Sequence, residues 1–470
     1  MRQASHLSGE PHSDDDGSPR FVPPKPASDH DVPQQDHDVP ADSLREIDLP
    51  TSLALVSGDN PRVGYVRQRI VEACAELEAA EALWLPSVRV GANYNKHEGS
   101  LQDVGGRAID VSRGSMFTGF GARAVGASSP AVPGLSASFH LADAIFQPLI
   151  AQRTLAARKY AADSTTNDLL YQAAVAHLDL VQAVQHKRIA LETLDQLHKL
   201  AELTASFAAT EQGTQADADR ARTERDLQRN VVTRAEEGIR VAAARLAEVL
   251  NLDDGMQLRP SISTIVKVNL VPEDSDIEAL VSEAFENRPE MSQNTMEVSA
   301  ATQRYRRERY LPLIPHLGAG MSYGGFGGGT GGTIAHYRDR FDLDAWAYWE
   351  VRNLGVGEQT ARDAARARIV QTRFRGNELA NRIRREVVTA NARVHSARHQ
   401  VDQAHSVVNS AADSYRRNLE RIRNTLGLPL EVLQSIQALN ASKRELLDAT
   451  ASYNRSQFEL HRARGWPLAE

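Results

Sequence analysis

The sequence predicts a mainly α-helical chain with a membrane β-barrel contribution, built from one structural unit that is used twice. Each unit consists of two strands followed by a long helical hairpin, so the chain supplies four strands in all. Three observations predict this fold: long stretches with apolar residues at helical spacing, a second copy of that pattern later in the chain, and four short runs in which apolar and polar side chains alternate.

The first unit contains the clearest hairpin. Between residues 213 and 252, apolar or small side chains recur at intervals of three and four residues, which places them on one helical face. They are Val232, Ala235, Ile239, Ala242, Leu246 and Val249. An arm from about residue 150 to 210 has the same tendency, and a short turn at Gly213 joins the two arms into an antiparallel hairpin. At 1.5 Å per residue the first arm would be on the order of 90 Å long, which is longer than a compact domain is thick.

The second half repeats this hairpin. A shift of 214 positions aligns Gly213 and Asp217 with Gly427 and Glu431. The apolar spacing survives the shift, at Leu446, Ala449, Tyr453, Ser456, Leu460 and Ala463. We interpret the two hairpins as one architectural unit used twice.

Four runs alternate apolar and polar side chains, which is typical of strands with one apolar face. The apolar positions of the first two runs are Val88, Val90, Ala92 and Tyr94, then Leu135, Ala137, Phe139 and Leu141. Those of the other two are Leu317, Ala319, Met321 and Tyr323, then Phe341, Leu343, Ala345, Ala347 and Trp349. Loops rich in glycine are expected at residues 97–134 and 324–329. Strands of about ten residues can span a membrane, but four cannot close a barrel, so such a barrel needs several chains.

The segments outside the strands and hairpins divide the chain into four parts. Residues 1–48 are acidic and rich in Pro, Ser and His, and we expect a disordered tail. Residues 49–260 form the first repeat, 261–310 a connector with the entry helix of the second repeat, and 311–470 the second repeat. The tail holds eleven acidic and four basic side chains, which accounts for the whole net charge of −7. The neutral remainder gives no support for a nucleic-acid surface.

Several classes of chemistry lack the residues that they require. Cys74 is the single cysteine, which excludes an intrachain disulfide, and residues 324–329 lack the Gly-Lys-Ser/Thr of a phosphate-binding loop. His395 and His399 share a helical face but have no evident third ligand for a metal. We therefore expect no catalytic residue, no cofactor and no metal. No apolar stretch is long enough for a membrane-spanning helix, and residues 1–20 lack the apolar core of a signal peptide.

Two other classes of protein are open at this point. A soluble coiled-coil scaffold would have the same long helices, but would carry polar side chains on both faces of the four strand runs. A helical protein that organises DNA or RNA would need basic surfaces interleaved with aromatic residues, which the sequence does not have.

Short motifs along the chain, in this order and spacing, resemble those of the TolC-type outer-membrane efflux protein family (outer membrane factors), over about residues 50–468. They are Asn60-Pro61, Leu85-Pro86-Ser87, Gly213 with Asp217, Arg288-Pro289-Glu290, Gly427 with Glu431 and Gln434, and Ala463-Arg464-Gly465. The resemblance implies a homotrimer with a twelve-stranded barrel in the outer membrane and a helical tunnel in the periplasm. It also implies a passive exit duct of a tripartite efflux or type I secretion system, which works with an inner-membrane pump and a periplasmic adaptor protein.

The resemblance further implies a gate where the hairpins turn. Glu431 matches the first acidic position of a constriction ring in that family, Asp217 is its equivalent in the first repeat, and Gln434 stands where a second acid often occurs. Gly213 and Gly427 mark the two turns. A ring of three Glu431 carboxylates would attract cations. The alternative interpretation is that Glu431 is an acid in the first turn of a helix after Pro429, where the helix dipole favours it.

Overall fold

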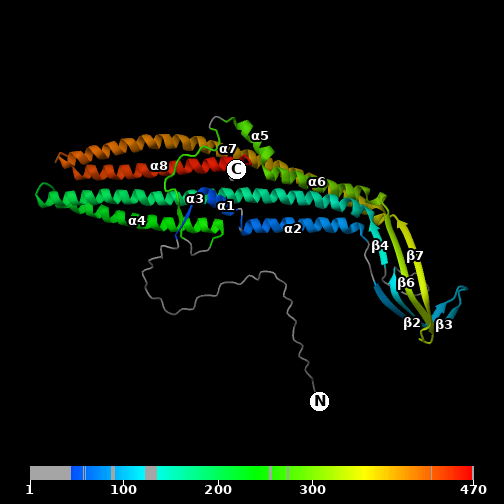
Figure 1. Ribbon diagram of the computed structural model, residues 1–470. Helices are drawn as coiled ribbons and strands as arrows, with labels where there is room; N and C mark the ends of the chain where they lie inside the picture. The colour runs from blue at the N-terminus through cyan, green and yellow to red at the C-terminus, as the bar shows by residue number, and fades with distance from the viewer. Residues whose placement is uncertain are drawn as a thin grey trace, which may run out of the picture. The chain divides into compact units, whose positions relative to one another are not determined.

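The computed structural model describes residues 44–56, 58, 60–85, 90–121, 135–252, 257–272, 275–424 and 426–467. The two predicted hairpins are confirmed (Figure 1). Helix α3 (Leu141–Ala209) pairs with α4 (Gln215–Leu250), and α7 (Val356–Arg423) pairs with α8 (Pro429–Ala463). The shorter helices α2 (Pro61–Glu81), α5 (Ile277–Asn287) and α6 (Pro289–Tyr310) complete the helical part, with α2 and α6 each beginning at a proline that supplies the φ angle of a first turn.

One antiparallel sheet continues from the ends of four of these helices. Its strands are β2 (Val90–Gln102), β3 (Ala108–Gly121), β4 (Leu135–His140), β6 (His316–Thr330) and β7 (Ala335–Tyr348). Strand β6 pairs with β7 along one edge, and its other edge is shared by β3 and β4, which lie end to end. Gly121 pairs with Ser322 and Leu135 with Met321, so the register passes from β3 to β4 without a gap. The predicted count of four strand positions is therefore confirmed, with one position made of two segments.

The prediction of loops at residues 97–134 and 324–329 is wrong for the residues that the structure describes. Residues 97–102 extend β2, residues 108–121 form β3, and the glycine run continues β6. The sequence analysis missed strand β3 because Ser112, Gly114 and Thr118 interrupt the apolar alternation on one of its faces. The glycines belong to a strand because β3 approaches closely: a Cβ on Gly324 would lie 2.3 Å from the carbonyl oxygen of Thr118.

Two of the predicted strand residues lie outside strands. Leu141 is the first residue of α3, because the pairing of β4 stops at His140, opposite the first residue of β6. Trp349 follows the end of β7, where the chain turns towards α7 through Asn353 and Leu354, both with positive φ. Val88 lies outside the described residues. The structure describes the backbone but not the side chains of Val90, Leu135, Ala137 and Phe139.

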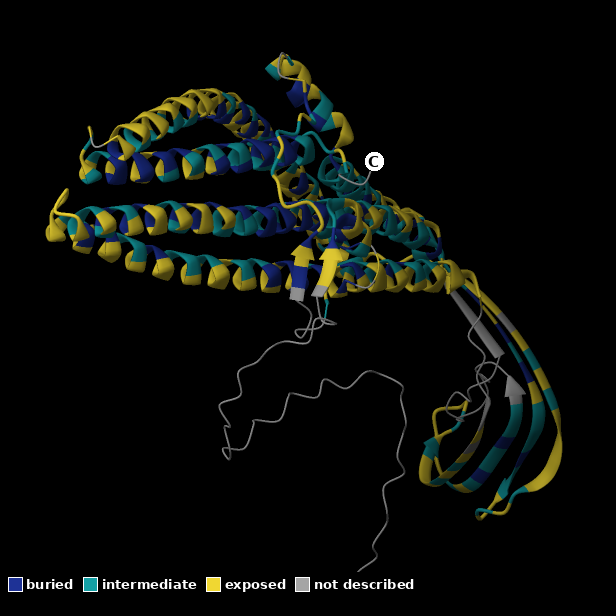
Figure 2. Cartoon of the chain, turned by 60° about the vertical axis from the view of Figure 1, so that its left-hand side comes forward, coloured by how far each residue is buried: buried dark blue, intermediate teal, exposed yellow. Residues whose placement is uncertain are grey.

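The other predicted apolar positions lie on one face of the sheet, and most of them are exposed (Figure 2). Phe341 is 61% and Leu343 is 71% exposed. Ala92, Tyr94, Ala319, Tyr323, Ala345 and Ala347 are exposed as well, and Leu317 and Met321 are partly covered. The opposite face carries a polar cluster, in which Arg340 pairs with Asp342 at 2.8 Å and Asp342 accepts a hydrogen bond from Ser322. Three aromatic side chains lie on the same face: Phe117, Phe326 and Trp346. A soluble sheet would bury its apolar face, so this pattern is inverted.

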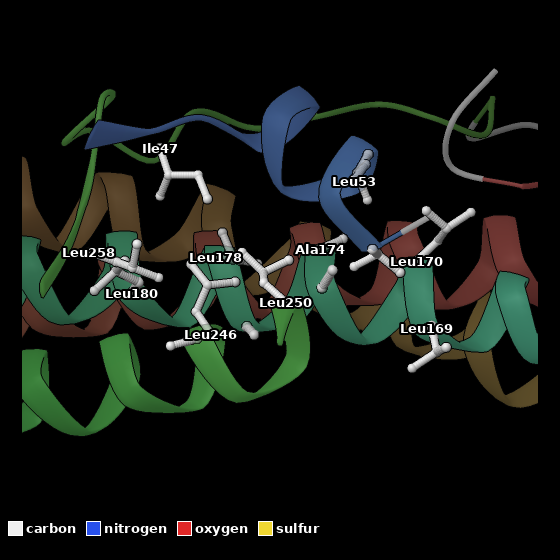
Figure 3. Packing of buried hydrophobic residues seen from close by; sticks show 14 of the residues in the cluster. Ile47, Leu53, Leu169, Leu170, Ala174, Leu178, Leu180, Leu246, Leu250 and Leu258 are labelled. Carbon is white, nitrogen blue, oxygen red and sulfur yellow. The ribbon is translucent and has the colours of Figure 1, made fainter. Parts of the chain in front are cut away.

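A small layer of short elements packs on one side of α3 and α4. Strand β1 (Leu44–Ile47) pairs in parallel with β5 (Gln257–Pro260), and α1 (Leu49–Val56) follows β1. Figure 3 shows the packed side chains: Ile47, Leu53 and Leu258 from this layer meet Leu170, Leu178 and Leu180 of α3, and Leu246 and Leu250 of α4. Ile47 is only 1% exposed. The expected tail must therefore end before residue 44, because residues 44–47 contribute to this core; residues 1–43 lie outside the described part.

The helices follow the lateral order of the strands. Next to the sheet the order is α2, α3, α6, α7, and away from it the order is α4, α3, α8, α7. This array has two edges, one formed by β2, α2 and α4 and the other by β7 and α7 (Figure 1). Large apolar side chains are exposed along these edge helices, among them Tyr65, Leu227, Val241, Phe374 and Val407. Among the described helices, none combines the length and apolar character that crossing a lipid bilayer requires.

Candidate gate at the hairpin tips

The turns of the two hairpins have the same backbone geometry. The amide of Gln212 donates to the carbonyl of Phe207 at 2.9 Å in the first turn. In the second turn the amide of Leu426 donates to the carbonyl of Arg421, also at 2.9 Å. These residues are related by the same shift of 214 positions that relates the two hairpins in the sequence. The internal repeat thus extends to the hydrogen bonds that reverse the chain.

Gly213 and Gly427 are required by close packing within these turns. A Cβ on Gly213 would lie 3.0 Å from the Cβ of Phe207, and a Cβ on Gly427 would lie 3.1 Å from the Cβ of Arg421 and from the amide nitrogen of Ile422. The glycines therefore allow the chain to fold back against the end of the preceding helix. Their role in the single chain is to shape the turn.

Asp217 lies in a hydrogen-bonded cap at the start of α4. The hydroxyl of Thr214 accepts from the amide of Asp217 at 3.1 Å and donates to its carboxylate at 2.7 Å. The first of these bonds satisfies a backbone N–H group that has no partner within the first turn of the helix, and the second holds the carboxylate beside Thr214. Within one chain, Asp217 acts first as a capping residue.

Glu431 combines a cap with an ion pair at the second tip. Its carboxylate accepts from the amide of Leu428 at 3.4 Å and lies 3.2 Å from the guanidinium of Arg421. Pro429 occupies the first turn of α8, as the alternative interpretation of Glu431 expected. Arg421 offsets part of the carboxylate charge, while Gln434 is exposed one turn further along α8. This geometry supports the capping role of Glu431. Its carboxylate is also partly exposed at the tip, where a gate residue would have to be accessible.

Three leucines on the second tip were missed by the sequence analysis. Leu426 is 74% exposed, Leu428 is 63% exposed, and Leu430 is exposed as well. The sequence feature that could have revealed these exposed leucines is their alternation with Gly427 and Pro429 in a turn, where polar residues are usual. Apolar side chains gathered on an exposed turn are typical of protein interaction sites.

Comparison with solved structures shows which known fold the chain has. Neither a family model nor a curated protein matches the sequence. The outer membrane protein VceC of Vibrio cholerae has a TM-score of 0.70 at 14% identity, over 90% of this chain and 97% of that one. The Campylobacter jejuni outer membrane channel CmeC gives 0.71 at 13% identity, over 90% and 87%. The Neisseria gonorrhoeae channel MtrE in its open state gives 0.65 at 14% identity, over 89% of both chains. This chain has the fold of outer-membrane channels.

Two motifs that lie far apart in the sequence, residues 288–290 and residues 463–465, meet in the structure. Gly465, with a φ of +90°, lies against the junction of α5 and α6: a Cβ there would be 2.8 Å from the amide nitrogen of Arg288. Beside it, Arg464 pairs with Glu283 at 2.7 Å and the indole of Trp466 donates to the same carboxylate. The end of α8 is thus fastened to the junction of α5 and α6. Burial opposes ionisation of Glu283, but Arg464 and Trp466 outweigh it, so its pKa lies below the ordinary value.

Arg288 itself fastens α6 to α7. Its side chain is 5% exposed and pairs with Glu290 at 2.8 Å and with Glu386 at 2.5 Å. Burial raises the pKa of Glu290, but the hydrogen bonds and charge of Arg288 outweigh it and hold that pKa below its ordinary value. A buried arginine with two carboxylate partners stabilises one relative position of the two helices.

The histidines considered as metal ligands in the sequence analysis can be located in the structure. Within the described ranges, no three His, Cys, Asp or Glu side chains gather in a way that could hold a metal ion. His395 and His399 both lie exposed on α7. The structure brings Gly213 and Gly427 and their acidic neighbours to matching tips, and at the second tip Arg421 pairs with Glu431.

Proposed function

We propose that this protein is an outer-membrane exit duct, a homotrimer that passively conducts solutes from a periplasmic tunnel to the cell exterior. The observation that carries the proposal is the inverted sheet, whose apolar face is exposed and whose opposite face holds the cluster of Arg340, Asp342 and Ser322. An exposed apolar band of this kind suits a lipid environment, and polar side chains suit a water-filled interior.

The lateral order of the elements supports closure by other copies. An open sheet edge in lipid would leave each backbone group unsatisfied, at a cost of several kcal/mol per group. Joining the β2 edge of one copy to the β7 edge of the next removes both edges, and the same step joins α2 and α4 to α7. Three copies give twelve strand positions, as the resemblance to the efflux family implies.

The hairpin tips are the proposed gate and docking site. In this proposal Gly213 and Gly427 shape the turns, while Asp217, Glu431 and Gln434 face the constriction. Exposed leucines at the second tip support contact with a periplasmic adaptor protein, which would connect the duct to an inner-membrane pump. The tail, the two repeats and the connector remain proposed divisions, with the tail ending at residue 43. Neither a cofactor nor a nucleic acid is part of this proposal.

Two measurements test the proposed function. Cell fractionation should find the protein with outer-membrane markers. The purified protein should also conduct ions across a planar lipid bilayer, in discrete steps. Recovery in the soluble fraction together with a lack of conductance would contradict the proposal and would favour a soluble coiled-coil scaffold.

A further inference from the structure

A pocket of about 340 Å³ lies where α3, α6 and α7 run side by side, and its charge is strongly positive. Arg158 of α3, Arg304 of α6, and Arg368 and Arg375 of α7 line it, together with a single carboxylate, that of Glu297. Four guanidinium groups against one carboxylate give the pocket a formal charge of +3. Like charges that line one pocket repel one another, and an anion bound among them would offset this repulsion.

These four arginines lack protein partners of opposite charge. Within the described part of the chain, none of them pairs with a carboxylate, whereas the neighbouring Arg288 and Arg307 each contact two. The carboxylate of Glu297 accepts a hydrogen bond from Gln293 at 2.9 Å. Guanidinium groups present several hydrogen-bond donors in a plane that matches carboxylates and phosphates. The pocket therefore has the chemistry of a site for anionic groups.

Helical geometry places this pocket on the side of the array opposite the β1 and α1 layer. On α3, His177 faces α1, because its ring lies 3.2 Å from the hydroxyl of Ser52. His186 comes nine residues later, half a turn around the helix, and lines a second pocket with Arg234 and Arg444. Gln185 of α3 also faces the β1 and α1 layer, because its side-chain amide donates to the carbonyl of Ser263, shortly after β5, at 2.9 Å. Arg158 precedes Gln185 by 27 positions, or seven and a half turns, so Arg158 lies on the opposite side of α3.

In a closed ring the β1 and α1 layer must lie outside, because it would otherwise fill the lumen. Arg158 then faces the lumen.

We propose that the cluster of Arg158, Arg304, Arg368 and Arg375 is a lumenal site for anionic solutes, and that it makes the duct conduct anions in preference to cations. This inference rests on the proposed function. A trimer would present the cluster three times around one lumen, and fixed charge on a pore wall concentrates ions of opposite sign. At the hairpin tips, Arg421 pairs with Glu431 and offsets part of the acidic charge there.

The test is the reversal potential of the full-length protein in a planar bilayer under a potassium chloride gradient. The wild type should prefer chloride, and the quadruple variant Arg158→Gln/Arg304→Gln/Arg368→Gln/Arg375→Gln should lower the chloride-to-potassium permeability ratio by about threefold or more. The control is Arg153→Gln/Arg306→Gln/Arg366→Gln/Arg373→Gln, which removes the same charge from exposed positions on the same three helices, turned away from the pocket. The control should keep the wild-type ratio.

Inorganic pyrophosphate provides a second readout. It should reduce wild-type conductance and leave the quadruple glutamine variant unaffected, and a quadruple lysine variant should keep both the block and the chloride preference. Equal reversal potentials in the wild type and the quadruple glutamine variant, or a wild type that prefers potassium, would overturn the anion site while the duct remains. An absence of any conductance would instead contradict the proposed function.

Discussion

Replacing Gly465 by alanine should destabilise the protein, because two separate costs arise at this position. A φ of +90° is unfavourable for a residue with a Cβ, by about 1–2 kcal/mol. The added Cβ would also lie 2.8 Å from the backbone of Asn287 and Arg288, which cannot move aside as a flexible side chain can. Overpacking of this kind costs about 1–3 kcal/mol. We expect Gly465→Ala to lower the free energy of unfolding by about 2–5 kcal/mol per chain.

Thermal unfolding of the detergent-purified protein, followed by circular dichroism, measures this effect. Gly64→Ala is the matched control, since Gly64 lies exposed in α2 with open space where its Cβ would stand. Alanine is favoured over glycine inside a helix, so this control should unfold at the same temperature as the wild type or at a higher one. Equal midpoints for Gly465→Ala and the wild type would refute the idea that the repeat is fastened through this contact.

Four further predictions follow from the gate, the sheet, the buried titratable groups and the N-terminus. Arg421→Gln should raise cation permeation in single-channel recordings, and Glu431→Gln should lower it. Because this ion pair is exposed, each variant should lose at most about 1 kcal/mol of stability. Asp217→Asn should change cation permeation less than Glu431→Gln does, and Gln434→Ala should change it little. Leu343→Lys should reduce the amount of protein in the outer membrane, whereas Leu191→Lys, at an exposed leucine of α3, should not. Burial lowers the pKa of His177 below its ordinary 6.5. The contribution of His177 to stability is therefore present above pH 6.5 and is lost as the pH falls through the pKa of the folded state. Denaturant titrations at several pH values should show this loss of stability, and His177→Gln should abolish the pH dependence. Deleting residues 1–43 should leave trimer yield unchanged, while deleting 1–48 should lower it, because Ile47 is buried.

The hairpins and the number of strand positions could be predicted because both leave a periodic signal in the sequence. Helical spacing is strong over arms as long as α3 and α7, and alternation is clear in β7, where Phe341 and Leu343 share a face. Strand β3 left no such signal, since Ser112, Gly114 and Thr118 interrupt the apolar residues on one of its faces. The strands β1 and β5 have four residues each, too few for a period to show.

Contacts between distant parts of the sequence could not be predicted from local patterns. The candidate gate residues were proposed from their place in two matching turns. The ion pair of Arg421 with Glu431 and the exposure of Leu426 depend on how the second turn folds back, which local patterns do not show. The arginine pocket combines side chains from three helices that are far apart in the sequence. Arg158 and Arg375 become neighbours only through the lateral order of the helices.

The measurement that tests the account most directly is the native mass of the purified full-length chain in detergent. A duct closed through its β2 and β7 edges predicts a single species with three times the mass of the chain. A stable species of one or two chains that retains the full strand content would contradict closure by three copies, and with it the duct.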